Sequence, residues 1–209
     1  MTDALSDSDA PQRGRILRLP FATRETAPDF PTVRAVQSHW ESLREGRIAP
    51  ARSEIDPRPL SHCLDVMFVA ELVAPRVARL RLAGQQLGDL LGMEPRGMPL
   101  SVFFTGAARD ELGEALSQVS QGARALLPLR ADPSLAQPAL DGMLALLPLT
   151  DTEGRITRVL GVLETRGPIG RAPRRFRLVA PPRTQHDIAP SRVPGGQRPN
   201  LTVIAGGKA

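Results

Sequence analysis

One stretch of the chain, 78–82, alternates strictly between hydrophobic and polar positions. Its apolar residues are separated by Arg79 and Arg81, which is the period-2 pattern of a strand with one buried face and one wet face. Leucines then recur at 87, 90 and 91, the spacing of a short amphipathic helix. Gly92 can adopt the positive φ of a helix end. The pattern therefore predicts a strand, a short helix and a glycine-bounded loop over 92–98.

Two longer helices are predicted on either side of this stretch. We expect Asp29 to cap the first, with Pro31 in its opening turn and Gly46 at its end. The only Trp in the chain, Trp40, lies on its apolar face and is predicted to be a buried anchor. We expect Thr105 to cap the second helix. The apolar faces of the two helices are Val33, Val36, Trp40 and Leu43, and Ala108, Leu112, Ala115, Leu116 and Val119.

Four further segments have the composition of strands. They are 65–72, 123–129, 139–149 and 156–164. Pro128 and Pro148 each lack a ladder donor, so we expect them at strand ends, bulges or sheet edges. The order is helix, strand, strand, short helix, helix and three strands with hairpin-length links. This order predicts an α+β fold with one antiparallel sheet and helices grouped on one face, and it excludes a parallel doubly wound fold.

The composition bounds the domain organisation. The chain has 209 residues, with 21 Pro and 18 Gly, which suits one domain with long loops or tails. We expect a mostly disordered arm over 1–29, a domain over 30–166 and a Pro/Gly/Arg-rich disordered tail over 167–209. From 167 onward eight basic residues accompany one acid, Asp187. The positive charge of the chain therefore belongs to the tail.

Cysteine use and the N-terminus bear on localisation. The single cysteine, Cys63, has no partner for a disulfide within the chain, which favours a reducing compartment. No run of about 18 apolar residues is present, and the first residues are acidic and polar rather than those of a secretory leader. We expect a soluble, cytoplasmic protein.

A set of spaced motif residues gives a family resemblance. They are Trp40, Arg44, Arg47, Pro50, Arg52, Asp56, Pro57, Gly84, Gly92 and Gly97. The order of elements resembles the PAS domain, and these residues resemble an alphaproteobacterial PAS-like subfamily, formerly a domain of unknown function. The resemblance covers roughly 32–165. It implies a five-stranded antiparallel sheet in the order 2-1-5-4-3, with helices enclosing a small cavity, and a role in sensing a ligand or binding another protein.

The cavity that the resemblance implies leaves two readings of the apolar residues near it. The candidate ligand-binding residues are Phe68, Leu87, Met93, Met98, Phe103 and Phe104. As plain core they need no ligand, and this reading is the simpler one. No cofactor is predicted, and an unknown small ligand is left open. We expect the 92–98 loop to be the place where a ligand or partner makes contact.

The residues that carry catalytic chemistry are few. His62 and Cys63 are adjacent, so on a helix their side chains point about 100° apart, and a working Cys–His pair is disfavoured. The histidines have no i, i+4 spacing for a metal, and phosphate-loop and dinucleotide-binding glycine patterns are absent. Nothing matches the flavin-photosensing PAS motif, and no haem-ligating histidine can be assigned. We expect no enzyme activity.

Two function hypotheses follow from different classes. The first is a non-enzymatic sensory or protein-interaction module in bacterial signalling, with a protein partner and homodimerisation left open. The alternative is a nucleic-acid or anionic-membrane binder that uses a basic tail cluster, where phosphate attraction would supply the affinity. A solvated charge run is the commoner outcome for such a cluster. Its residues are Arg171, Arg174, Arg175 and Arg177.

Overall fold

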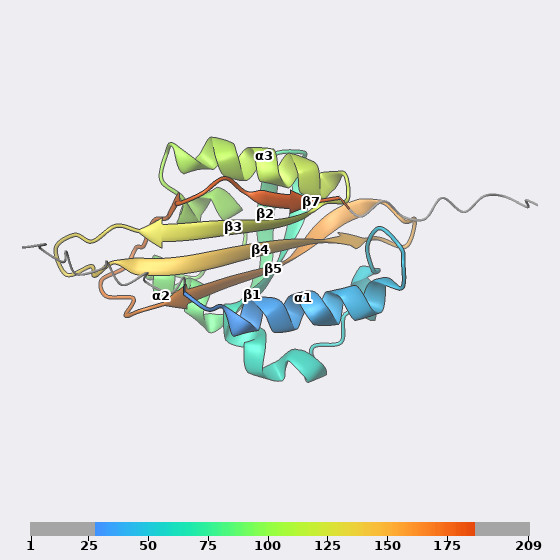
Figure 1. Ribbon diagram of the computed structural model, residues 1–209, viewed down its shortest axis with the longest axis horizontal. Coiled ribbons are helices and arrows are strands. Elements are labelled where there is room, and N and C mark those ends of the chain that lie inside the picture. The colour runs from blue at the N-terminus through green and yellow to red at the C-terminus, as the bar shows by residue number, and fades with distance from the viewer. Residues whose placement is uncertain (1–27, 187–209) are drawn as a thin grey trace, which may run out of the picture.

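The computed structural model describes residues 28–186 (Figure 1). The predictions for 1–27 and 187–209 lie outside the described residues. The helices are α1 (Pro31–Arg44), α2 (Gln85–Leu91) and α3 (Ala108–Ser120), and the 3₁₀ helices are η1 (Arg52–Glu54), η2 (Arg58–Val66) and η3 (Leu100–Phe103). The strands are β1 (Met67–Ala74), β2 (Val77–Ala83), β3 (Arg124–Ala131), β4 (Leu140–Thr150), β5 (Ile156–Arg166), β6 (Arg177–Leu178) and β7 (Arg183–Gln185).

The strands form one antiparallel sheet. Their order is β2-β1-β5-β4-β3-β6, and β7 also pairs with β3. The first five strands therefore have the order 2-1-5-4-3, which confirms the predicted fold class. The links β3–β4 and β4–β5 are short because each joins neighbouring antiparallel strands.

Hydrophobic residues are buried on both faces of the sheet. The inner face is covered by α2, η3 and α3, and its core contains Phe68, Leu87 and Phe103. The outer face is covered by α1 and η2, and its core contains Trp40 and Cys63. Figure 1 shows α1 and α3 on opposite sides of the strands. The N-terminal helix and η2 thus form a separate layer, which corrects the prediction that the helices are grouped on one face.

The N-terminus of α1 is capped from a distant strand. Pro31 occupies the first turn as predicted, but the predicted cap Asp29 is wrong: Phe30 is the N-cap and makes no side-chain capping bond. The backbone N–H of Val33 instead donates to Oε2 of Glu164 in β5, at 3.0 Å. Asp29 pairs with Arg34. Because Glu164 is buried under the start of α1, it satisfies a donor that water cannot reach.

The predicted cap of α3 is also wrong. The helix begins at Ala108, and its N-cap Ala107 makes no side-chain capping bond. The backbone N–H of Thr105 donates to the carbonyl of Phe176, at 2.9 Å. Thr105 is thus paired with a later segment of the chain, and Asp110 and Glu111 in the first turn complement the helix dipole.

Both prolines lie where a strand lacks a partner on one side, as predicted. Pro148 pairs with Val159 of β5, but the pairing of β4 with β3 ends at Leu146. Pro128 of β3 lies between the residues that pair with β6 and those that pair with β7. In each case the missing N–H leaves no ladder bond unmade.

The prediction of a disordered tail from Gly167 onward does not hold for 167–186. We call this segment the C-terminal extension. Its strands β6 and β7 extend the sheet along β3, and Phe176 is fully buried in the inner core. The backbone N–H of Phe176 donates to Phe103. One buried aromatic residue within an arginine run therefore orders a segment that composition alone indicates to be polar.

None of the helices within 28–186 has the length and apolar composition needed to cross a bilayer.

Candidate functional site

Trp40 fastens α1 to the sheet. Its ring is fully buried, and its Nε1–H donates to the carbonyl of Pro148 at 2.9 Å. The guanidinium carbons of Arg44 and Arg124 each lie 5.8 Å from the ring centroid. Both arginines also donate to the carboxylate of Glu41. The N–H group of this buried indole thus has a hydrogen-bond acceptor, and cation–π contacts add to its packing.

The next two motif residues join the end of α1 to the end of β4. Arg47 donates to the carbonyl of Leu43 at 2.6 Å and to Oε1 of Glu54 at 3.0 Å. The pKa of Glu54 is lowered by the hydrogen bond from Arg47 and by one from the backbone N–H of Ala51. The carbonyl of Pro50 accepts from the backbone N–H of Thr150 at 3.0 Å. These motif residues therefore have structural roles.

The other turn residues of the motif are structural as well. A Cβ on Gly84 would lie 2.1 Å from the carbonyl oxygen of Leu64, so only glycine allows η2 to pack this closely. Gly92 and Gly97 have φ of 75° and 82°, which glycine adopts without strain. The carboxylate of Asp56 accepts from the backbone N–H of Arg58 at 3.0 Å, in the turn that leads into η2, whose N-cap is Pro57.

Arg52 differs from the other motif arginines because its side chain makes no hydrogen bond or ion pair to any residue within 28–186, and its Nε is buried without an acceptor. It lines a pocket of about 370 Å³, the Arg52 pocket, between η1, η2 and the strands β1 and β2. Sequence reasoning placed Arg52 in a motif but could not separate it from Arg44 and Arg47. The lining residues are Arg52, Ile55, Pro57, Leu64, Asp65, Met67, Phe68, Val69, Leu82, Ala83, Gly84 and Leu160.

Four of the six candidate ligand-binding residues meet in the inner core. Phe68, Leu87, Phe103 and Phe104 are each at most 2% exposed and belong to one cluster, and Met98 packs against it. The ring of Phe68 lies on Gly161, where an added Cβ would be 1.9 Å from the ring. These side chains fill the inner face by packing against one another.

The sixth candidate, Met93, lies outside this core and is 58% exposed. It lines an open pocket of about 620 Å³ with other residues of α2, the 92–98 loop and the C-terminal extension, including Asp89, Glu94 and Ile169. The loop thus borders a surface depression of mixed polarity. The inner core lies behind it.

The residues with potential catalytic chemistry are separated. Cys63 is buried on the outer face of the sheet, where burial and then the charge of Glu164 raise the pKa of its thiol. A raised pKa lowers the thiolate fraction at neutral pH, which makes the sulfur less reactive. His62 is exposed, and His186 contacts Gln118. Within 28–186, no three His, Cys, Asp or Glu residues are placed to hold a metal ion.

Three members of the basic tail cluster bind within the protein. Arg174 is 1% exposed and donates to the carbonyls of Ile169 and Pro138, and its burial lowers its pKa. Arg175 donates to the carbonyl of Val102. Arg177 pairs with both carboxylate oxygens of Asp132, at 2.8 and 3.0 Å.

Only Arg171 of the four is exposed without a side-chain contact in the described part of the chain. The cluster therefore offers little charge to a phosphate backbone. Its arginines hold the C-terminal extension against the domain instead.

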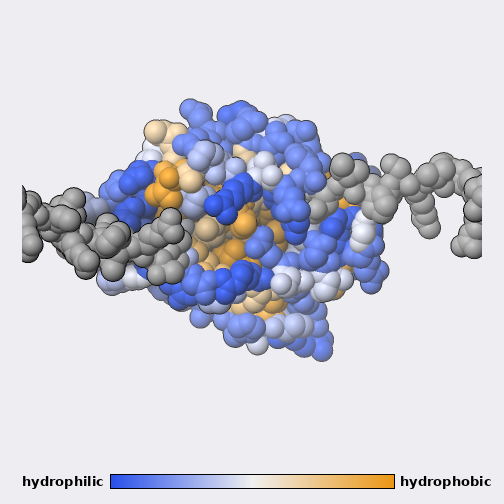
Figure 2. Space-filling view, in the orientation of Figure 1, coloured by the Kyte–Doolittle hydropathy of each residue, from blue (hydrophilic) through white to orange (hydrophobic). Residues whose placement is uncertain are grey.

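Helix α1 leaves part of the outer face of the sheet uncovered. Figure 2 shows hydrophobic side chains over β3 and β4, between β7 and α1. This outer apolar patch surrounds a pocket of about 280 Å³. Val179 is 50% exposed. The residues of the patch are Pro28, Phe30, Leu126, Pro128, Leu129, Gly142, Met143 and Val179, with Asp141 and Arg183 at its polar positions.

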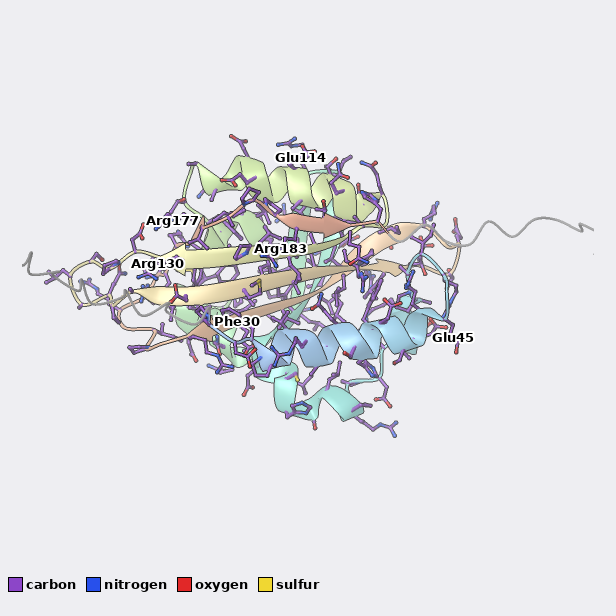
Figure 3. The ribbon with its side chains drawn as sticks, in the orientation of Figure 1. Phe30, Glu45, Glu114, Arg130, Arg177 and Arg183 are labelled. Carbon is purple, nitrogen blue, oxygen red and sulfur yellow. The ribbon has the colours of Figure 1, made fainter. Side chains whose placement is uncertain are left out.

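Basic side chains lie beside the outer apolar patch. In Figure 3, Arg130, Arg177 and Arg183 lie along β3, on one side of the patch. Phe30 lies on the opposite side of the patch, at the start of α1. Arg130 pairs with Asp141 at 2.8 Å, whereas Arg183 makes no ion pair among the described residues. Sequence reasoning missed this patch because its residues come from four separate segments. No local pattern could have brought them together.

Comparisons with known proteins agree with the topology. A family model described as a PAS domain matches residues 28–164. No curated protein matched the chain significantly.

Solved structures of low identity are also similar to the chain. The light state of the blue-light photoreceptor Aureochrome1 LOV has 14% identity and a TM-score of 0.39, covering 53% of this chain and 88% of that one. Its dark structure has 16% identity and a TM-score of 0.40, with coverages of 67% and 86%. An RNA-binding Light-Oxygen-Voltage receptor has 18% identity and a TM-score of 0.40, with coverages of 55% and 35%.

Proposed function

Because the chain belongs to the PAS-domain family, we propose that it is a non-enzymatic sensory and protein-interaction module of bacterial signalling. The observation that carries this proposal is the outer apolar patch. Exposed hydrophobic side chains gathered next to a charged rim are typical of a protein-binding surface. The patch lies on the part of the outer sheet face that α1 leaves open within residues 28–186 (Figure 2).

The chemistry of the patch defines its partner. Leu126 and Met143 are half-buried and Val179 is 50% exposed, so these three side chains offer hydrophobic contact beside the buried Phe30. Arg183 has no acidic partner among the described residues, so it is available to a carboxylate. We propose a different protein that places apolar side chains on the patch and an acidic residue opposite Arg183, because such charge pairing fixes orientation and excludes wrong partners.

Site-specific photo-crosslinking in the native host tests this proposal. A benzophenone amino acid replaces Val179, and the matched control carries it at Leu135, which is 91% exposed in the β3–β4 hairpin, away from the patch. We expect a discrete adduct with another protein from position 179 and none from position 135. Identical products from both positions, or no adduct from 179, would contradict the proposal. So would an adduct with a second copy of the chain or with residues 1–27 of the same chain.

A further inference from the structure

The Arg52 pocket is an apolar depression with a single basic side chain. Its walls include Met67 and Val69 of β1, Leu82 of β2 and Leu160 of β5. Leu82 and Leu64 are 54% and 43% exposed, so the walls present hydrophobic surface that nothing in the described part of the chain covers. A volume of about 370 Å³ lies within the range of small-molecule sites.

The guanidinium of Arg52 is the unusual feature of this pocket. Arg44 and Arg47 each bind a carboxylate or a carbonyl, but Arg52 binds no acceptor in 28–186, and its Nε is shielded from water. A buried donor without an acceptor is unfavourable. A carboxylate that enters the pocket removes this deficit, because the planar fork of arginine matches the two oxygens of a carboxylate.

We propose that the Arg52 pocket binds a small amphipathic monocarboxylate, with its carboxylate on Arg52 and its hydrocarbon body against Val69, Leu82 and Leu160. No other basic residue lines the pocket, so a phosphate dianion would find one cation only. Asp65 lines it too, with an exposed side chain, and its negative charge opposes a second anionic group on the ligand. The site therefore selects a single charge on an apolar body.

This inference goes beyond the proposed function and does not depend on it. The Arg52 pocket and the outer apolar patch share no residue. A ligand can therefore bind in the pocket whether or not a protein occupies the patch. Each experiment can fail while the other succeeds.

Isothermal titration of the full chain with octanoate at neutral pH tests the proposal. We expect saturable binding at one site in the micromolar to millimolar range. Octan-1-ol, which has the same chain without the charge, is expected to bind at least about tenfold more weakly, because hydrogen bonds to charged groups are among the stronger ones. This comparison uses the unmodified protein, so it is independent of any effect of mutation on folding.

Three variants identify the residues. Arg52→Gln is expected to weaken octanoate binding by about tenfold or more. Arg58→Gln is the matched control, because Arg58 is an exposed arginine of η2 that does not line the pocket. Asp65→Asn is expected to tighten binding, since it removes a like charge, a change that a merely structural role of Asp65 would not produce. Circular dichroism and thermal unfolding confirm that each variant is folded.

Several results would overturn the proposal. The first is that the wild-type chain does not bind octanoate at millimolar concentration. The second is that octanoate and octan-1-ol bind with equal affinity. The third is that folded Arg52→Gln binds octanoate as tightly as the wild type does. Weaker binding in Arg58→Gln than in Arg52→Gln would place the carboxylate elsewhere.

Discussion

Gly161 in β5 has no side chain, and the ring of Phe68 from β1 lies where one would be. The two residues are direct partners in the β1–β5 ladder. A Cβ at position 161 would lie 1.9 Å from the ring. The inner core is therefore built around a contact between an aromatic ring and bare backbone.

We expect Gly161→Ala to lower the free energy of unfolding by about 2 kcal/mol, because overpacking forces the Phe68 ring out of its position. In the background of Phe68→Leu, which removes the ring, the same change should have a smaller effect, below about 1 kcal/mol. Urea denaturation of the four proteins measures this coupling. An alanine that destabilises both backgrounds equally would show that the contact is not the cause.

Glu164 of β5 holds the N-terminus of α1 against the sheet. Its Oε2 caps the backbone of Val33, its Oε1 accepts from Arg166 at 2.7 Å, and its side chain is 5% exposed. We expect Glu164→Ala to lower the free energy of unfolding by about 2 kcal/mol, since it removes a cap and leaves a buried donor unpaired.

Glu153→Ala is the matched control for Glu164→Ala. Glu153 also pairs with an arginine, but the pair is 66% exposed, so its loss should change the unfolding free energy by no more than about 0.5 kcal/mol. Equal effects of the two substitutions in urea denaturation would show that the buried cap contributes nothing.

Residue-scale predictions from sequence succeeded where the cause is local. The 3, 4, 3 spacing around Trp40 predicted its burial. The cap of α1 could not be predicted, because Val33 and Glu164 are 131 residues apart. The motif likewise did not reveal which of its arginines lacks an acceptor, since that depends on the positions of Glu41 and Glu54 in space.

At the scale of elements, the C-terminal extension completes the inner core. Phe176 is fully buried, and its backbone pairs with Phe103 and Thr105. We expect Phe176→Ala to lower the free energy of unfolding by about 3 kcal/mol or more, as for other buried aromatic residues. Val179→Ala, three residues later and 50% exposed, is the control and should change it by less than about 1 kcal/mol. A Phe176→Ala variant as stable as Val179→Ala would contradict the packing of this segment.

The ion pair between Arg177 of β6 and Asp132 makes the free energy of unfolding depend on pH. The hydrogen bond from Arg177 lowers the pKa of Asp132 below its ordinary value of 3.8, and the charge of Arg177 acts in the same direction. A lowered folded-state pKa gives stability that is present above pH 3.8 and is lost as the pH falls through the folded pKa. Asp132→Asn should therefore be less stable than the wild type at pH 7.

The difference between Asp132→Asn and the wild type should shrink as the pH falls below 3.8, because the wild-type carboxylate loses its charge there, first in the unfolded chain and at lower pH in the folded state. Urea midpoints at pH 7 and pH 3 measure it. Other carboxylates with lowered pKa values, such as Asp29 and Asp151, titrate in both proteins and cancel in the comparison. A difference of equal size at both pH values would rule out this linkage.

The elements that sequence predicted correctly are those whose own residues show a periodic hydrophobic pattern. Alternation and helical periodicity located α2, β2 and the last long strands, and their order was enough for the sheet topology. The C-terminal extension was missed because Phe176 is one apolar residue among arginines, and the partners of those arginines are carbonyls and Asp132. The prediction of helices grouped on one face did not hold for α1, because β4 and β5 are apolar on both faces and their pattern does not show that a second layer covers the sheet.

At the scale of the whole molecule, the two faces of the sheet have different roles. The inner face is closed by packed aromatic and aliphatic side chains. The outer face carries both the Arg52 pocket and the outer apolar patch. Helix α1 is next to each of them, because η2 packs against it and Phe30 precedes it. The outer face is therefore the face on which both the carboxylate ligand and the protein partner are proposed to bind.

The affinity of the crosslinked partner for variants of the chain measures how much the outer apolar patch contributes to binding. Val179→Glu places a charge in the outer apolar patch, and Leu135→Glu places the same charge at a more exposed position of the β3–β4 hairpin, outside the patch. We predict that Val179→Glu raises the dissociation constant at least about tenfold, which corresponds to about 1.4 kcal/mol, while Leu135→Glu leaves it unchanged. Equal dissociation constants for wild type and folded Val179→Glu would contradict the account.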